Sequence, residues 1–298
     1  IAASETDSNL YYATRFIAPD PFIYLEVKGE RLMVMSDLEV DRARNQATVD
    51  RVLSYSELER RAKSQGVKDP GTIDVIHLVL QDAGLKDILV PPTFPFLHAS
   101  RLQEMGYRLR TKRDPFYEQR VMKSDDEVRH IEAAQRATET AVAAAHQHLR
   151  RAEIRDNVLW LDGEILTSER VKKLINVALM ECDCVAQHTI VAGGEQACDP
   201  HDEGSGPLPA HRSIIFDVFP RSAGTRYFAD MSRTVVRGTP SPELTRLYHA
   251  VKDAQEEAIT KIRDGADGAA IHQGICDRFE KAGYKTGLVN GRMQGYFH

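Results

Sequence analysis

The first third of the chain alternates short apolar runs with a segment of helical periodicity. Phe22–Val27 and Arg31–Met35 have the composition of two strands joined by a tight turn, and Asp87–Val90 has that of a short buried strand. Between them, apolar residues recur at helical spacing over Thr72–Ala83. This alternation predicts an α/β domain with a mixed sheet over residues 1–113.

Residues 114–298 favour longer helices. Ser124 and Glu127 have the spacing of a capping box ahead of a long alanine-rich run, which predicts the start of a helix. A second helix is expected to follow Thr167, and two more are expected at Ser241–Arg263 and Gly268–Ala282. Strands are expected between these helices, and the boundary between the two domains is expected near Asp114-Pro115.

Composition excludes several classes of protein. The 298 residues carry a net charge of −5, which gives no basic footprint for nucleic acid. No apolar run reaches the length of about 18 residues that a membrane span needs. Four unevenly placed cysteines do not form a disulfide scaffold and favour a reducing cytoplasm. We therefore expect a cytoplasmic protein that binds neither nucleic acid nor membrane.

Two acids stand on either side of a predicted turn. The apolar run Ile214–Phe216 predicts a buried strand that ends on Asp217, and Tyr227–Val236 predicts a returning strand that contains Asp230. A turn centred on Ala223-Gly224 places the two acids directly opposite each other, with Cβ atoms about 5 Å apart. Like charges at that distance destabilise a sheet unless a cation lies between them, so the hairpin predicts a site for divalent metal ions.

A simpler interpretation stays open, because acids are common beside turns and the choice of turn centre decides which residues face each other. Two features favour the metal site. Asp217 follows an apolar run, where an unpaired charge is costly. Ser232, Arg233 and Thr234 follow Asp230 and could donate the hydrogen bonds that orient a ligating carboxylate.

Several stretches of the chain together resemble one family of enzymes. The segment Tyr227–Thr234, preceded by Ile-Ile-Phe-Asp217, resembles the metallopeptidases of the pita-bread fold, in the branch of the Xaa-Pro aminopeptidases and prolidases. Further resemblances cover the entry to the catalytic domain, a loop with a substrate-side histidine and the smaller amino-terminal domain, at Arg120–Glu127, Val191–His201, Asn9–Tyr12 and Ala99–Gly106. The resemblance extends over nearly the whole chain.

This resemblance implies a fold and a set of roles. Residues 1–113 would form the creatinase-like amino-terminal domain, and residues 114–298 part of the α+β pita-bread catalytic domain. Asp217 would chelate one metal ion and Asp230 would bridge two, with Mn²⁺ favoured and Co, Zn or Fe as alternatives. His201 and His298 would lie beside the substrate, where a neutral histidine can hold the carbonyl or donate to a developing oxyanion.

The implied activity is hydrolysis of the bond before proline, in dipeptides or at the amino terminus of longer peptides. Water activated between two metal ions would attack the carbonyl. The resemblance also implies a homodimer.

The chain departs from the family in two ways. The acids are two residues further apart than the family pattern, which lengthens the hairpin without changing the face they occupy. The sequence also stops at His298, before the positions where the family has a ligand histidine and two ligand glutamates. We therefore expect a fragment of a longer enzyme, with Ile1 in place of an initial Met, that is inactive by itself and holds metal weakly or not at all.

Two other functions use the same fold. Pita-bread domains that have lost their ligands serve as metal-free peptide-binding modules, and the creatinase branch consists of metal-free C–N hydrolases acting on a small amidino acid. Neither needs two acids on one face, so the presence of Asp217 and Asp230 favours the peptidase.

Overall fold

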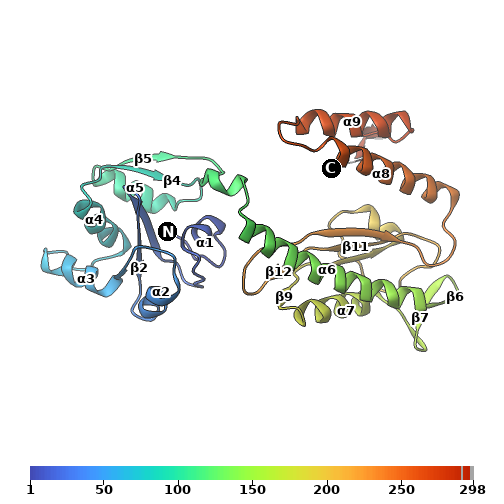
Figure 1. Ribbon diagram of the computed structural model, residues 1–298, viewed down its shortest axis with the longest axis horizontal. Helices are drawn as coiled ribbons and strands as arrows, with labels where there is room; N and C mark the ends of the chain where they lie inside the picture. The colour runs from blue at the N-terminus through green and yellow to red at the C-terminus, as the bar shows by residue number, and fades with distance from the viewer. Residues whose placement is uncertain (290, 296–298) are drawn as a thin grey trace. The chain divides into compact units, whose positions relative to one another are not determined.

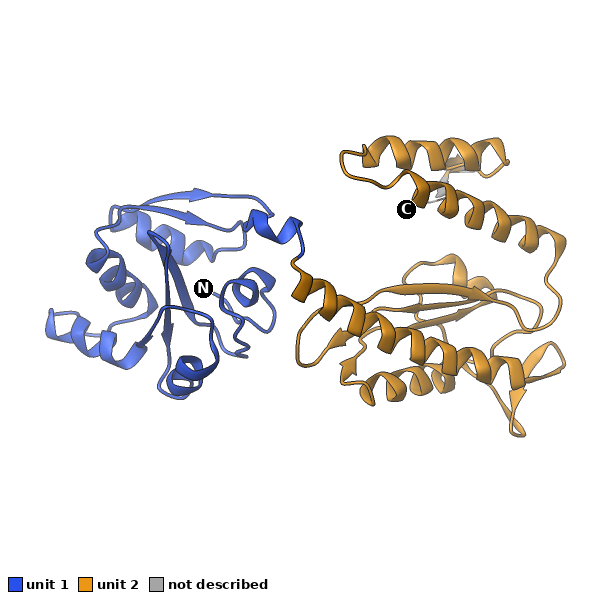
Figure 2. Ribbon diagram, in the orientation of Figure 1, with its two compact units in different colours: residues 1–123 blue, residues 124–298 orange. Residues whose placement is uncertain are grey.

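The computed structural model describes residues 1–289 and 291–295, and contacts divide the chain into two compact units (Figure 2). Unit 1 is Ile1–Lys123 and unit 2 is Ser124–His298. Residues 114–123, predicted to lie in the second domain, belong to unit 1 by their contacts. The domain boundary near residue 114 stays a prediction, distinct from this division by contacts.

Unit 1 alternates short strands and helices (Figure 1). Its elements are α1 (Ser8–Thr14), β1 (Ile23–Val27), β2 (Glu30–Met35), α2 (Val40–Gln46), β3 (Arg51–Ser54), α3 (Tyr55–Ser64), α4 (Thr72–Asp82), β4 (Asp87–Val90), α5 (Phe96–Glu104), β5 (Arg108–Thr111) and the 3₁₀ helix η1 (Glu118–Val121).

The sheets of unit 1 mix antiparallel and parallel pairs. β1 and β2 form the predicted hairpin, whose turn residues Lys28 and Gly29 have φ angles of 52° and 87°, in the left-handed region that two-residue hairpin turns require. β3 lies parallel to β2 after the crossover through α2, and β5 lies parallel to β4 after α5. The mixed α/β architecture predicted for this part of the chain is confirmed.

Unit 2 has longer helices and antiparallel sheets (Figure 1). Its elements are α6 (Asp125–Arg151), β6 (Glu153–Arg155), β7 (Val158–Leu161), β8 (Glu164–Ile165), α7 (Ser168–Met180), β9 (Cys184–Val185), β10 (Ile190–Gly193), the 3₁₀ helix η2 (Gly194–Cys198), β11 (Ile214–Val218), β12 (Arg221–Ser222), β13 (Met231–Val235), α8 (Pro242–Lys261), α9 (Gly268–Lys281), β14 (Gly287–Val289) and β15 (Arg292–Gln294).

Helix α6 begins at the predicted capping box. Ser124 Oγ accepts from the backbone N–H of Glu127 (3.3 Å), and Glu127 Oε2 accepts from the backbone N–H of Ser124 (2.9 Å). The buried side of the helix is rich in small residues, which let it approach the sheet closely. These residues are Ala134, Ala137, Ala141 and Ala145.

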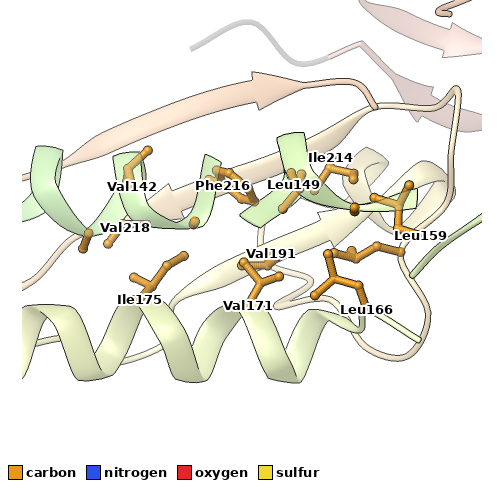
Figure 3. Close-up of a cluster of buried hydrophobic side chains, with 14 of the residues drawn as sticks. Val142, Leu149, Leu159, Leu166, Val171, Ile175, Val191, Ile214, Phe216 and Val218 are labelled. Atoms are coloured by element: carbon orange, nitrogen blue, oxygen red, sulfur yellow. The ribbon is translucent and has the colours of Figure 1, made fainter. Parts of the chain in front are cut away.

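The core of unit 2 lies between helices α6 and α7 and the antiparallel sheet β10–β11–β13. Along β11 the side chains alternate: Ile214, Phe216 and Val218 are buried among residues of α6 and α7, as Figure 3 shows. Ile215 and Asp217 point to the opposite face and are only partly buried. The strand therefore presents Asp217 on the face that does not carry the core.

Within the described residues, no helix combines the length and the apolar composition needed to cross a lipid bilayer. All four cysteines are free thiols.

Candidate metal centre

Strands β11 and β13 form the hairpin that carries both predicted metal ligands. Their register pairs Asp217 with Ser232 and Val218 with Met231. The same register continues toward the loop, where Arg221 and Phe228 form an isolated bridge. Asp217 therefore lies opposite Ser232, and the prediction that it directly faces Asp230 is wrong.

The loop of the hairpin explains this difference. The backbone N–H of Ser222 donates to the carbonyl of Tyr227 (2.9 Å), so the loop consists of residues 223–226. Its centre lies between Gly224 and Thr225, one position later than the Ala-Gly pair suggested. Arg226 ends the loop with a φ of 65°, a left-handed conformation that is uncommon for residues other than glycine. The composition of the segment gives no signal for it.

Asp217 and Asp230 nevertheless lie on one face. Asp230 precedes Ser232 by two positions, and the N–H of Ala229 donates to the carbonyl of Pro220 (3.1 Å), so the pairing extends to both sides of Asp230. Side chains two positions apart on a strand share a face, which makes Asp230 a diagonal neighbour of Asp217 at about 7–8 Å. Partial loss of solvent raises the pKa of Asp230, and the negative charge of Asp217 raises it further.

The residues that follow Asp230 differ in what they contact. Ser232 Oγ donates to Asp217 Oδ1 (2.6 Å), which orients that carboxylate. Arg233 pairs with Phe216, on the opposite face from Asp217, and its Nη1 donates to the carbonyl of Ser232 (2.8 Å). Thr234 pairs with Ile215 and shares the face of Asp217. Ser232 is thus the neighbour that holds an acid directly.

His201 lies on the loop after η2 that returns beside β10. The N–H of Val191 in β10 donates to the carbonyl of Glu203 (3.1 Å), so the loop runs along the edge of the sheet. The backbone N–H of His201 donates to Asp199 Oδ1 (3.1 Å), and the residue is exposed. The second predicted histidine, His298, lies outside the described residues.

Sequence reasoning missed a contact between the start of α6 and the hairpin. The Tyr227 hydroxyl donates to Glu127 Oε1 (2.6 Å), and Glu127 is 7% exposed. The ring of His130 lies 5.4 Å from that of Tyr227, measured between centroids. The capping box explained Glu127 fully at the sequence level, so nothing pointed to a partner 100 positions away. Tyr227 stands three residues before Asp230 and holds that part of the hairpin against the helix.

We expect Tyr227→Phe to lower the free energy of unfolding of unit 2 by about 1–3 kcal/mol, because a buried carboxylate loses a donor. Urea unfolding followed by the fluorescence of Trp160, the single tryptophan of the chain, measures this in unit 2. The matched control is Tyr248→Phe, at a tyrosine that is 47% exposed on α8, where a change within about 0.5 kcal/mol is expected. Equal effects of the two substitutions would contradict a stabilising role for the hydrogen bond between Tyr227 and Glu127.

The donor set fits part of a metal site. Asp217 and Asp230 provide carboxylate oxygens, the ligands of hard divalent cations. A cation between them would offset both the partial loss of solvent and the repulsion by Asp217, which together raise the pKa of Asp230. Within residues 1–289 and 291–295, no three His, Cys, Asp or Glu side chains form a group that could hold a metal ion. In the described part of the chain, Asp217 and Asp230 are therefore a pair of candidate ligands and fall short of a complete site.

Comparison of sequences gives a family for the chain. Residues 129–297 match the model of metallopeptidase family M24, over more than half of the chain. An uncharacterized peptidase of Staphylococcus epidermidis is 30% identical over 167 residues, which are 55% of this chain and 44% of the relative. The chain thus matches less than half the length of that relative. An Xaa-Pro dipeptidase of Lactobacillus helveticus is 33% identical over 100 residues, 32% of this chain and 26% of the relative.

Solved structures with the same fold agree with the sequence matches. The Xaa-Pro dipeptidase from Bacillus anthracis has a TM-score of 0.77 at 17% identity, covering 94% of this chain and 72% of its own. The prolidase from Pyrococcus furiosus has a TM-score of 0.73 at 18% identity, covering 94% and 74%. The predicted fold class and the resemblance to the Xaa-Pro branch of the pita-bread fold are confirmed. The chain belongs to metallopeptidase family M24.

Proposed function

We propose that this protein is a metal-dependent peptidase that hydrolyses the bond before proline, in Xaa-Pro dipeptides or at the amino terminus of longer peptides. One observation carries the proposal: two carboxylates of an M24 chain share one face of a sheet, where partial loss of solvent and then the charge of Asp217 raise the pKa of Asp230. The printed names of the Lactobacillus helveticus and Bacillus anthracis relatives support the Xaa-Pro specificity.

Asp217 and Asp230 are the proposed ligands of two divalent cations, with Asp230 shared between them. Ser232 orients the Asp217 carboxylate through its 2.6 Å hydrogen bond, which leaves the second oxygen, Oδ2, for a cation. A carboxylate-rich donor set suits Mn²⁺, with Co, Zn or Fe as alternatives. When bound, the cations supply Lewis acidity to the peptide carbonyl and to a water molecule.

The histidines have a proposed role toward the substrate. His201 is exposed on a loop tethered to the edge of β10, so its side chain is accessible to a peptide. We assign it and His298 to the substrate carbonyl, where a histidine N–H can donate to the negative charge that develops on oxygen. Arg233 and Thr234 complete the proposed surroundings of the acids, Arg233 through the backbone of Ser232. The homodimer and the cytoplasmic location stay predictions.

The test measures proline release from Xaa-Pro dipeptides by the protein expressed from its complete reading frame. We expect activity that disappears on dialysis against a chelator and returns with Mn²⁺, because the acids need a cation to act. Calorimetry on the 298-residue chain provides the comparison. Because its described residues provide two proposed ligands, Asp217 and Asp230, we expect it to bind Mn²⁺ weakly. Chelator-resistant activity would contradict metal dependence, and tight, stoichiometric Mn²⁺ binding by the 298-residue chain would contradict the expected weak site.

A further inference from the structure

The hairpin that carries the two acids also carries two phenylalanines. The register of β11 and β13 continues to the bridge between Arg221 and Phe228, which places Phe219 directly opposite Asp230. Phe228 precedes Asp230 by two positions, so its side chain lies on the same face of the hairpin. One ring therefore lies across the hairpin from Asp230, and the other is its neighbour along the strand.

The hydrogen bonds of this stretch bring the paired side chains close together. The N–H of Ala229 donates to the carbonyl of Pro220 (3.1 Å), so these two residues form a hydrogen-bonded pair. Phe219 and Asp230 form the next pair, which is non-hydrogen-bonded, and side chains approach most closely in such pairs. Their Cβ atoms are expected about 5 Å apart, and Phe228 is a diagonal neighbour of Phe219, within reach of its ring.

Both rings lie outside the core of unit 2. Phe228 is 58% exposed and Phe219 is partly buried, and among the described residues neither belongs to an apolar cluster. Phe216 and Val218 point to the other face of the hairpin, where they are fully buried. Large apolar side chains that lie together outside a core, beside polar groups, are typical of a surface that binds a ligand.

Charged groups limit this apolar surface on both sides. Asp230 and its diagonal neighbour Asp217 lie toward the sheet. Toward the loop, the guanidinium carbon of Arg221 lies 6.0 Å from the centroid of the Phe228 ring. We call Phe219 and Phe228 the aromatic wall. Its two levels along the hairpin are about 7 Å apart, a length that suits one extended side chain.

Resting on the proposed function, we propose that the aromatic wall binds the side chain of the residue before proline, so that the protein prefers Xaa-Pro peptides in which this residue is large and apolar. In that function the attacked carbonyl lies at cations held by Asp217 and Asp230. The Cα atom of the residue before proline is bonded to this carbonyl carbon, and its side chain can extend along the wall and bury apolar surface there. The proline ring is closed on its own backbone nitrogen and cannot extend in this way.

The test compares kcat/KM for Leu-Pro and Gly-Pro, with Mn²⁺ present and the protein expressed from its complete reading frame. Leu-Pro is expected to be favoured by about tenfold or more, because apolar pockets distinguish side chains that differ by single methylene groups by about 10–200-fold. Phe228→Ala is expected to remove most of this preference, and Phe228→Leu, which keeps an apolar surface, to retain more of it. The matched control is Met180→Ala, at a side chain that is 69% exposed on α7, behind the other face of the sheet; it should leave the ratio unchanged.

The outcomes separate this proposal from the proposed function. A preference that survives Phe228→Ala overturns the proposal and leaves the peptidase activity in place. Equal losses for Leu-Pro and Gly-Pro also overturn it, because they would place the proline ring, common to both substrates, against the wall. Absence of proline release from both dipeptides overturns the proposed function and this proposal together.

A second measurement covers a Phe228 variant that does not fold. In the unchanged protein, kcat/KM is expected to rise through the series Gly-Pro, Ala-Pro, Val-Pro and Leu-Pro, as the apolar area that can be buried against the wall increases. A flat or falling series overturns the proposal without any substitution.

Discussion

Asp230→Asn is expected to abolish proline release by the protein expressed from its complete reading frame. Loss of a residue that only orients a metal ligand costs about 10–100-fold, so loss of a shared ligand should exceed 100-fold. Ser232→Ala provides that milder comparison, because it removes the hydrogen bond to Asp217 and keeps both carboxylates. Steady-state rates at saturating Mn²⁺ measure both variants.

In the metal-free protein, Asp230→Asn is expected to stabilise the folded state at neutral pH. The pKa of Asp230 is raised above its ordinary value of 3.8, so the folded state holds this proton more tightly than the unfolded state. Stability is therefore lost as pH rises from about 3.8 through the raised pKa, because the ionised Asp230 carboxylate is partly removed from solvent and is repelled by Asp217. Asp230→Asn should have the higher melting temperature at pH 7, and the difference should vanish near pH 3.

These two readouts separate chemistry from folding. A variant that is inactive but more stable at pH 7 supports Asp230 as a ligand. Unchanged turnover would remove Asp230 from the site, and a lower melting temperature at pH 7 would show that the carboxylate stabilises the hairpin in some other way.

Phe216→Ala is expected to lower the free energy of unfolding of unit 2 by about 3–5 kcal/mol. Phe216 is 0% exposed, and its truncation removes apolar contacts and leaves a cavity between β11 and the helices. Ile215→Ala is the matched control, since Ile215 precedes Phe216 in the same strand and lies on its partly exposed face. Urea unfolding followed by Trp160 fluorescence reports both in unit 2.

The expected order is a clearly smaller loss for Ile215→Ala than for Phe216→Ala. Because the chain has two units, the fluorescence transition should be compared with circular dichroism, which reports both units. Similar losses for the two substitutions would mean that both faces of β11 are equally packed, contrary to the alternation in burial.

Local signals in the sequence predicted the individual elements well. The capping box of Ser124 and Glu127 marks the start of α6, and alternating apolar residues mark the β1–β2 hairpin. Each signal involves residues within a few positions of one another, so short-range physics is sufficient. The prediction that Asp217 and Asp230 share one face also held, because the residue opposite Asp217 moved by two positions, from Asp230 to Ser232, and a shift of two keeps side chains on the same face.

Register and long-range contacts could not be obtained in this way. The loop of the hairpin contains Arg226 in a left-handed conformation, which cannot be predicted from an arginine side chain. With this loop, the residue opposite Asp217 is Ser232 and not Asp230. The bond between Tyr227 and Glu127 joins residues 100 positions apart. Such contacts follow from packing of whole elements, which no window of sequence contains.

The alternation along β11 separates two kinds of constraint on evolution. Odd-numbered positions such as Ile215 and Asp217 can change identity with little effect on whether the chain folds, while even-numbered positions such as Ile214 and Phe216 are restricted to apolar residues of similar volume. A lineage could therefore acquire a new reactivity, or lose the old one, by substitutions on one side of a single strand. Divergence of activity on this scaffold does not require a new architecture.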